Sequence, residues 1–128
     1  MMKLVLEPPV PPVPVGAMRV LIVYETADLP KMDRGQYGVL FDAKVRGALK
    51  DRCDKAGPDG RGYNIWDQNT DVSQMSKFWQ DAMKRPRASV PFVHGWKGDQ
   101  IAFEGPLPKN ADETVALLTK YASAGRTK

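Results

Sequence analysis

The sequence predicts an α/β domain with a mixed four-stranded sheet covered by helices on both faces. The first observation is a continuous apolar run at residues 19–24, which is typical of a central strand buried on both faces. The second is that helical and strand patterns alternate after this run, in the order β-α-β-α-β-β-α. A right-handed parallel crossover joins the first two strands, and an antiparallel hairpin joins the last two.

The first helix is predicted to follow the loop at residues 25–32. Asp33 and Gln36 have the spacing of a capping box. Apolar side chains then recur at helical spacing, and the helix extends to about residue 55. The glycine- and proline-containing segment 57–60 ends it.

The remaining elements follow in the same way. Methionine and aromatic residues repeat every three or four positions before Pro86, which predicts a helix with a buried face. Glycine near residue 98 predicts a hairpin turn. The predicted elements are strands 63–66, 89–94 and 101–104, a helix over 72–84, and a last helix capped by Asn110 and Glu113.

Both ends of the chain differ from this domain, which we place at residues 18–124. Residues 1–17 contain a proline-rich run, including Pro11 and Pro12, that favours an extended polyproline II arm. This arm is either a stiff linker or a segment that docks on a protein partner. Residues 125–128 form a short basic tail.

Composition excludes several classes of protein. The chain has 128 residues, 42% of them hydrophobic and 27% charged, as in an ordinary globular domain. It contains no apolar stretch of the ~20 residues that a membrane span needs, and no signal peptide pattern. We therefore expect a cytoplasmic protein, or part of a particle assembled in the cytoplasm. The net charge of +4 is spread among acidic residues, so nucleic acid is not the expected partner.

Cysteine and histidine each occur once. Cys53 has no second cysteine for a disulfide and no companion metal ligand, and its charged neighbours predict partial exposure at a helix end. His94 lies in a predicted strand, where a lone histidine is usually structural. We expect no metal site and no cofactor.

Three segments resemble the thioredoxin-like superfamily, and the resemblance covers residues 18–124. Residues 89–92, Ser-Val-Pro-Phe, are similar to the family's strand entry, where the proline is cis. Residues 97–105 resemble the family's closing hairpin, including the glycine after its last strand. Residues 29–32 occupy the place of the family's Cys-x-x-Cys-Lys segment.

The departure from the family decides the expected function. Residues 25–32 contain no cysteine, and Cys53 lies about twenty residues further along the chain. Dithiol exchange needs two cysteines, and the reactive one gains its low pKa at a helix start. The sequence therefore predicts a non-catalytic module that binds protein within a larger assembly, of which a phage or virus particle is one setting.

The resemblance implies a binding surface, which we call the ledge, formed by Val90, Pro91, Thr26, Pro30 and Lys31. In the family, the backbone before the proline pairs with an extended peptide, in the manner of strand addition. Trp96 on the hairpin either adds an exposed aromatic anchor or packs against the sheet.

Two other functions remain open at this point. One is a thioredoxin-like enzyme without a cysteine pair, similar to glutathione transferases, for which Tyr24 and Thr26 are the nearby hydroxyls; an arsenate-reductase-like enzyme would need a cysteine that this segment lacks. The other is a basic accessory protein for nucleic acid, whose binding would weaken steeply with salt.

Overall fold

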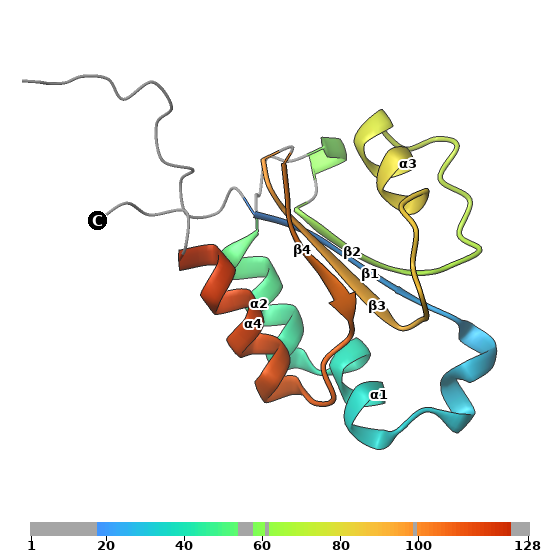
Figure 1. The fold of residues 1–128 in the computed structure, drawn as a ribbon, viewed down its shortest axis with the longest axis vertical. Coiled ribbons are helices and arrows are strands. Elements are labelled where there is room, and N and C mark those ends of the chain that lie inside the picture. The colour runs from blue at the N-terminus through green and yellow to red at the C-terminus, as the bar shows by residue number, and fades with distance from the viewer. Residues whose placement is uncertain (1–17, 54–57, 61, 99, 124–128) are drawn as a thin grey trace, which may run out of the picture.

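A computed structural model describes residues 18–53, 58–60, 62–98 and 100–123 (Figure 1). The proline-rich arm at 1–17, with Pro11 and Pro12, and the basic tail at 125–128 lie outside the described residues. The predictions made for the arm and the tail therefore stay predictions.

Four strands form one mixed sheet in the order β2-β1-β3-β4. β1 runs parallel to β2 and antiparallel to β3, and β3 runs antiparallel to β4. The predicted α/β class with a mixed four-stranded sheet is thus confirmed. The strands are β1 (Met18–Tyr24), β2 (Tyr63–Asp67), β3 (Phe92–Lys97) and β4 (Gln100–Pro106).

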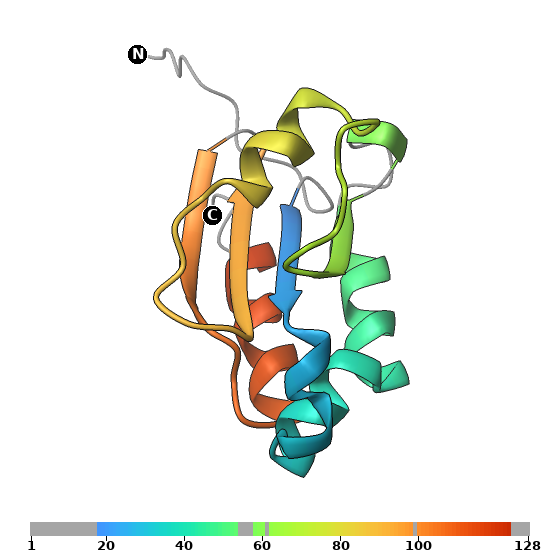
Figure 2. The same ribbon diagram turned by 90° about the vertical axis from the view of Figure 1, so that its right-hand side faces the viewer.

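Helices cover the sheet on both faces. In Figures 1 and 2, α1, α2 and α4 lie on one face, and α3 lies on the other. A short 3-10 helix, η1, connects β1 to α1, and a second one, η2, precedes β2. The helices are η1 (Thr26–Lys31), α1 (Arg34–Phe41), α2 (Ala43–Arg52), η2 (Pro58–Gly60), α3 (Lys77–Met83) and α4 (Ala111–Ser123).

The predicted single helix after residue 33 is two helices, because Asp42 interrupts it. Asp42 has an extended backbone (φ −75°, ψ 133°), and its carboxylate accepts a hydrogen bond from the Lys44 amide at 2.6 Å. An aspartate side chain that caps a new helix competes with the helix that it would otherwise continue. The expected start of the first helix at Asp33 is correct, because the Asp33 side chain accepts a hydrogen bond from the Gly35 amide and caps α1.

Other boundaries also shift. α3 begins at Lys77 rather than residue 72, because the Asp71 side chain bonds the Ser73 amide in a turn before it. β3 begins only after Pro91, and β4 extends to Pro106. The cap of α4 is as predicted: the Glu113 amide donates to the Asn110 side chain at 2.9 Å.

β1 separates two apolar cores. Val20 and Ile22 pack with the helices α1, α2 and α4 in the larger core, whereas Leu21 and Val23 pack with α3 in the smaller one. All four side chains are fully buried. This is the two-sided burial that the continuous apolar run predicts.

Gly95 in β3 allows the larger core to close. A Cβ built on Gly95 would lie 2.1 Å from the Phe103 ring of the neighbouring strand. We predict that Gly95→Ala lowers the free energy of unfolding by about 1–3 kcal/mol through overpacking. Gly38→Ala in α1 is the control; no atom lies within 4 Å of its Cβ, and we expect a gain of about 0.5–1 kcal/mol. Urea denaturation measures both, and equal effects of the two substitutions would contradict this packing.

Candidate functional site

The ledge lies at one end of the sheet, where β1 ends and β3 begins. Val23 near the end of β1 pairs with Phe92, the first residue of β3. η1 follows directly after β1, so it lies beside the segment that leads into β3 (Figure 1). The topology thereby brings together residues 26–31 and 90–91, which are about sixty positions apart in the sequence.

Hydrogen bonds to Asp67 hold the start of η1. The Thr26 amide and hydroxyl donate to one oxygen of the Asp67 carboxylate at 2.7 and 2.6 Å, and the Asn69 amide donates to the other at 2.7 Å. Because these donors stabilise the charged form, the Thr26 hydroxyl above all, the pKa of Asp67 is lowered. Glu25 caps η1 by accepting from the Ala27 amide at 2.9 Å.

Pro91 and Val90 form the other side of the ledge. The Val90–Pro91 peptide bond is cis, as the sequence resemblance implied. The Pro91 carbonyl accepts a hydrogen bond from the Leu107 amide at 3.1 Å, and the Val90 side chain packs against the α3 core. Within the described part of the chain, the Val90 backbone makes no backbone hydrogen bond.

The exposed residues of η1 complete this surface. Thr26, Pro30 and Lys31 are all exposed, and Leu29 between them packs partly against the larger core. All five residues of the ledge therefore lie at the same end of the sheet. Of the two hydroxyls considered for catalysis, that of Thr26 is already engaged by Asp67, and the Tyr24 ring packs edge-on against Phe41.

Trp96 is not the exposed anchor that was one of its two predicted roles. It is 4% exposed and packs in the α3 core, with its ring 5.0 Å from that of Phe78. It pairs with Arg19 near the start of β1, so it lies toward the other end of the strand from the ledge. The physical reason is the strand alternation, which points Phe92, His94 and Trp96 to the covered face under α3.

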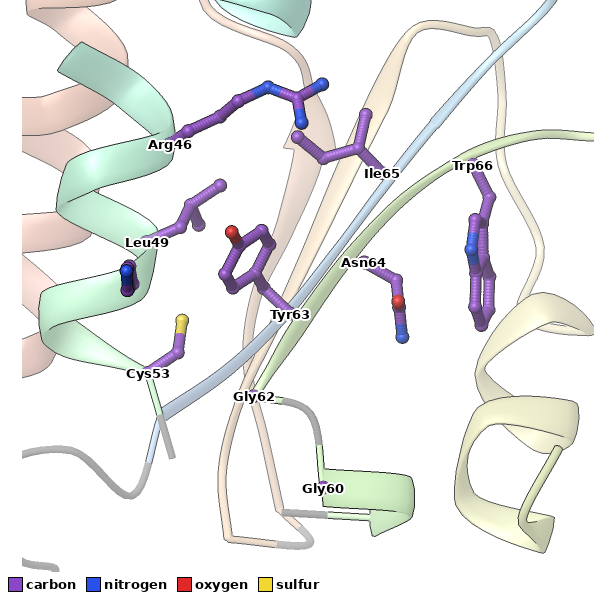
Figure 3. A pocket seen from close by; sticks show the side chains of 10 residues that line it. Arg46, Leu49, Cys53, Gly60, Gly62, Tyr63, Asn64, Ile65 and Trp66 are labelled. Carbon is purple, nitrogen blue, oxygen red and sulfur yellow. The ribbon is translucent and has the colours of Figure 1, made fainter. Parts of the chain in front are cut away.

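Cys53 is buried, in contrast to its predicted partial exposure. Cys53 is 2% exposed. Its backbone forms an isolated parallel β-bridge with Met18 at the start of β1. It caps the C-terminus of α2 at the end of the sheet opposite η1. It also lines a cavity of about 480 Å³ between α2 and β2 (Figure 3). The described residues contain no cluster of three or more side chains that could hold a metal ion.

A charged network that the sequence analysis missed surrounds His94. The fully buried His94 ring contacts the Glu104 carboxylate through Nδ1 at 2.7 Å, and Arg87 donates to its Nε2 at 3.2 Å. Arg85 donates to both oxygens of Glu104. Burial lowers the pKa of His94, and Arg85 lowers the pKa of Glu104 to about 2. Because Nε2 accepts from Arg87, the ring is neutral, with its proton on Nδ1.

This network is structural in character, because the histidine has no access to solvent. Two of its members, Arg85 and Arg87, come from the basic segment 84–87 at the end of the predicted helix 72–84, a position that cations favour because of the helix dipole. One feature could have indicated the network from the sequence. The predicted hairpin places His94 opposite Glu104 on the neighbouring strand, where side chains of opposite residues interact.

Comparison with models of known protein families, with characterised proteins and with solved structures finds no match to this chain. Among the described residues, no helix is long and apolar enough to cross a membrane.

The Thr26–Asp67 contact predicts a titration effect. In Thr26→Val the carboxylate loses its hydroxyl donor, so the pKa of Asp67 should rise toward its ordinary value near 3.8. Carboxyl carbon chemical shifts followed against pH measure this. Thr70→Val is the control, since only its backbone amide bonds Asp67. An unchanged pKa in Thr26→Val would contradict the contact.

The His94 network predicts that acid destabilises the fold. The pKa values of His94 and Glu104 are both lower in the folded state than in the unfolded state. The unfolded state therefore binds more protons as the pH falls. Stability should decline below about pH 6.5 because of His94, and further between about pH 4.5 and 2 because of Glu104. Denaturant titrations across pH measure this decline.

The variant Glu104→Gln isolates the contribution of the Glu104 carboxylate to this acid destabilisation from that of the other carboxylates. The variant should be less stable than wild type at pH 7, and the difference should shrink as the pH approaches 2. Asp112→Asn, which removes an exposed ion pair with Lys44, is the control. If the difference in unfolding free energy between wild type and Glu104→Gln did not change with pH, Glu104 would not titrate with the lowered pKa.

Proposed function

We propose that this chain is a thioredoxin-like module that binds protein, has no redox function, and belongs to a larger assembly such as a phage or virus particle. Its strand order, its crossover between β1 and β2 and its helices on both faces support the thioredoxin-like assignment. The ledge is its contact surface, together with the arm at residues 1–17.

The position of the only thiol supports a non-redox function. Cys53 is buried at the opposite end of the sheet from η1, which is where a reactive thiol of this family would lie. Thr26 occupies the start of η1, and its hydroxyl and amide are engaged by Asp67. A thiol that is 2% exposed is not accessible to a disulfide substrate.

The single observation that carries the binding proposal is the Val90 backbone beside exposed η1. Its amide and carbonyl lack backbone partners within the described residues, and Thr26, Pro30 and Lys31 form an exposed wall next to them. An extended peptide can pair with such backbone groups and place alternate side chains on the wall. The ligand is therefore an extended segment of a protein.

The test uses extended peptides selected by display against the full chain. Addition of such a peptide to the 15N-labelled chain should shift the amide signals of Val90 and of residues 26–31. Lys31→Glu should change the Kd severalfold, whereas Lys77→Glu, an exposed lysine on α3, should not. Signal changes confined to other surfaces, or equal effects of the two substitutions, would contradict the ledge as the binding surface.

A further inference from the structure

The segment between α3 and β3 leads directly into Val90 of the ledge, and few backbone hydrogen bonds hold it. Among the described residues, these bonds reach as far as the Arg85 amide, which donates to the Ala82 carbonyl, and resume at the Pro91 carbonyl. The described residues 86–90 form no backbone hydrogen bond between these points. Segments of this kind open locally at a lower free energy than global unfolding requires. The side-chain contacts of the segment therefore decide its position.

Arg87 supplies the polar side-chain contacts that hold residues 86–90. Its guanidinium donates to the Met83 carbonyl at the end of α3 at 2.7 Å, and to Nε2 of His94 in β3 at 3.2 Å. Because both donors belong to one planar guanidinium, a shift of this group away from His94 disturbs both bonds. Val90 adds an apolar contact with the α3 core. Arg87 is thus the polar link between the segment and the sheet.

This link requires a neutral His94. The Nε2 atom of the ring accepts from Arg87, and Nδ1 carries the proton that the Glu104 carboxylate accepts at 2.7 Å. A protonated ring has a hydrogen on both nitrogens and accepts no hydrogen bond. Its Nε2–H would then point at the Arg87 guanidinium, and two cations would face each other in a site where the ring is fully buried. The Glu104 contact persists, because Nδ1 donates in both states.

The charged groups that act on the His94 ring within the described residues are Glu104, Arg85 and Arg87. Glu104 on β4 is the one anion, and Arg85 already donates to both of its oxygens. Movement of Arg87 breaks neither of these Glu104 contacts, so Arg87 is the group that leaves when the ring is charged. The other neighbours of the ring are apolar or aromatic side chains from β1 and β3, namely Leu21, Phe92 and Trp96.

We propose that protonation of His94 releases Arg87 and with it residues 86–90, so that mild acid weakens peptide binding at the ledge. The effect on binding rests on the proposed function, whereas the release is a property of the free chain. Release removes the fixed Val90 backbone with which an extended peptide would pair. The observed Kd then rises in inverse proportion to the fraction of molecules whose segment stays docked. His94 is the only histidine of the chain, and histidine is the side chain that ordinarily titrates between about pH 5 and 8.

The free chain tests the release. A 15N-labelled sample is taken from about pH 7.5 downward until it unfolds, while the His94 ring signals and the heteronuclear Overhauser effect of each amide are followed. The values for Ala88, Ser89 and Val90 should fall with the midpoint of the His94 titration, while those of α2 stay constant. A His94 titration that leaves these three amides ordered would overturn the proposal. Unfolding of the whole chain before His94 titrates would overturn it as well.

Peptide affinity tests the effect on the ledge. A display-selected peptide without histidine, bound at about pH 7.5, should show a severalfold higher Kd at about pH 5. In His94→Gln, whose side chain stays neutral, the Kd should not depend on pH over this range. A wild-type Kd that is constant with pH would overturn this inference and leave the proposed function intact. Absence of any binding at the ledge at about pH 7.5 would instead overturn the proposed function, and the regulatory effect with it.

Matched substitutions in the basic segment 84–87 give a further test that needs no titration. Arg87→Met removes the polar link at every pH, so Ala88, Ser89 and Val90 should already be mobile at about pH 7.5. Lys84→Met, an exposed neighbour on the same segment, should behave as wild type. Far-ultraviolet circular dichroism checks that each variant folds; if His94→Gln does not, the wild-type titration decides. Equal order of these three amides in wild type and Arg87→Met would contradict the link.

Discussion

The burial of β1 on both faces and its pairing on both sides are the constraint on which the rest of the structure depends. Its four central side chains, Val20 to Val23, are fully buried, and they alternate between two cores. A strand so placed needs helices above and below it, and it needs partners for every backbone group. β2 and β3 supply those partners, and the chain direction of β1 determines which end of the sheet carries η1.

The sequence predicts the elements whose signals are local. The apolar run at 19–24 and the capping pair of Asn110 with Glu113 are both found where expected. The break at Asp42 was not predictable from periodicity, because the apolar face continues at helical spacing from Phe41 to Val45. There the local capping bond of an aspartate outweighs the pattern.

The candidate site was predictable in part. The resemblance implied that Val90 and Pro91 face residues 26–32, and the topology brings these segments to one end of the sheet. The Thr26–Asp67 contact joins residues 41 positions apart, so no local pattern indicates it. The burial of Trp96 follows from alternation along β3, but only once the covered face of that strand is known.

Two kinds of interaction therefore hold the surface on which a partner would act. Apolar burial under α3 positions Val90, and polar contacts of Asp67 and Glu25 position η1. The polar contacts engage the amide and hydroxyl of Thr26 at the start of η1. A reactive thiol would need a helix start whose amides are free. The hydrogen bonds that hold η1 would keep its exposed residues in place for the proposed recognition of an extended segment.

Catalysis of disulfide reduction is the most direct test of a function in binding rather than redox chemistry. The full chain and Cys53→Ser would each be added to insulin and dithiothreitol, and the rate of insulin reduction measured against the uncatalysed rate. We predict that both proteins leave the uncatalysed rate unchanged, because the only thiol is buried away from η1. A faster rate with the full chain that is lost in Cys53→Ser would contradict the non-redox function.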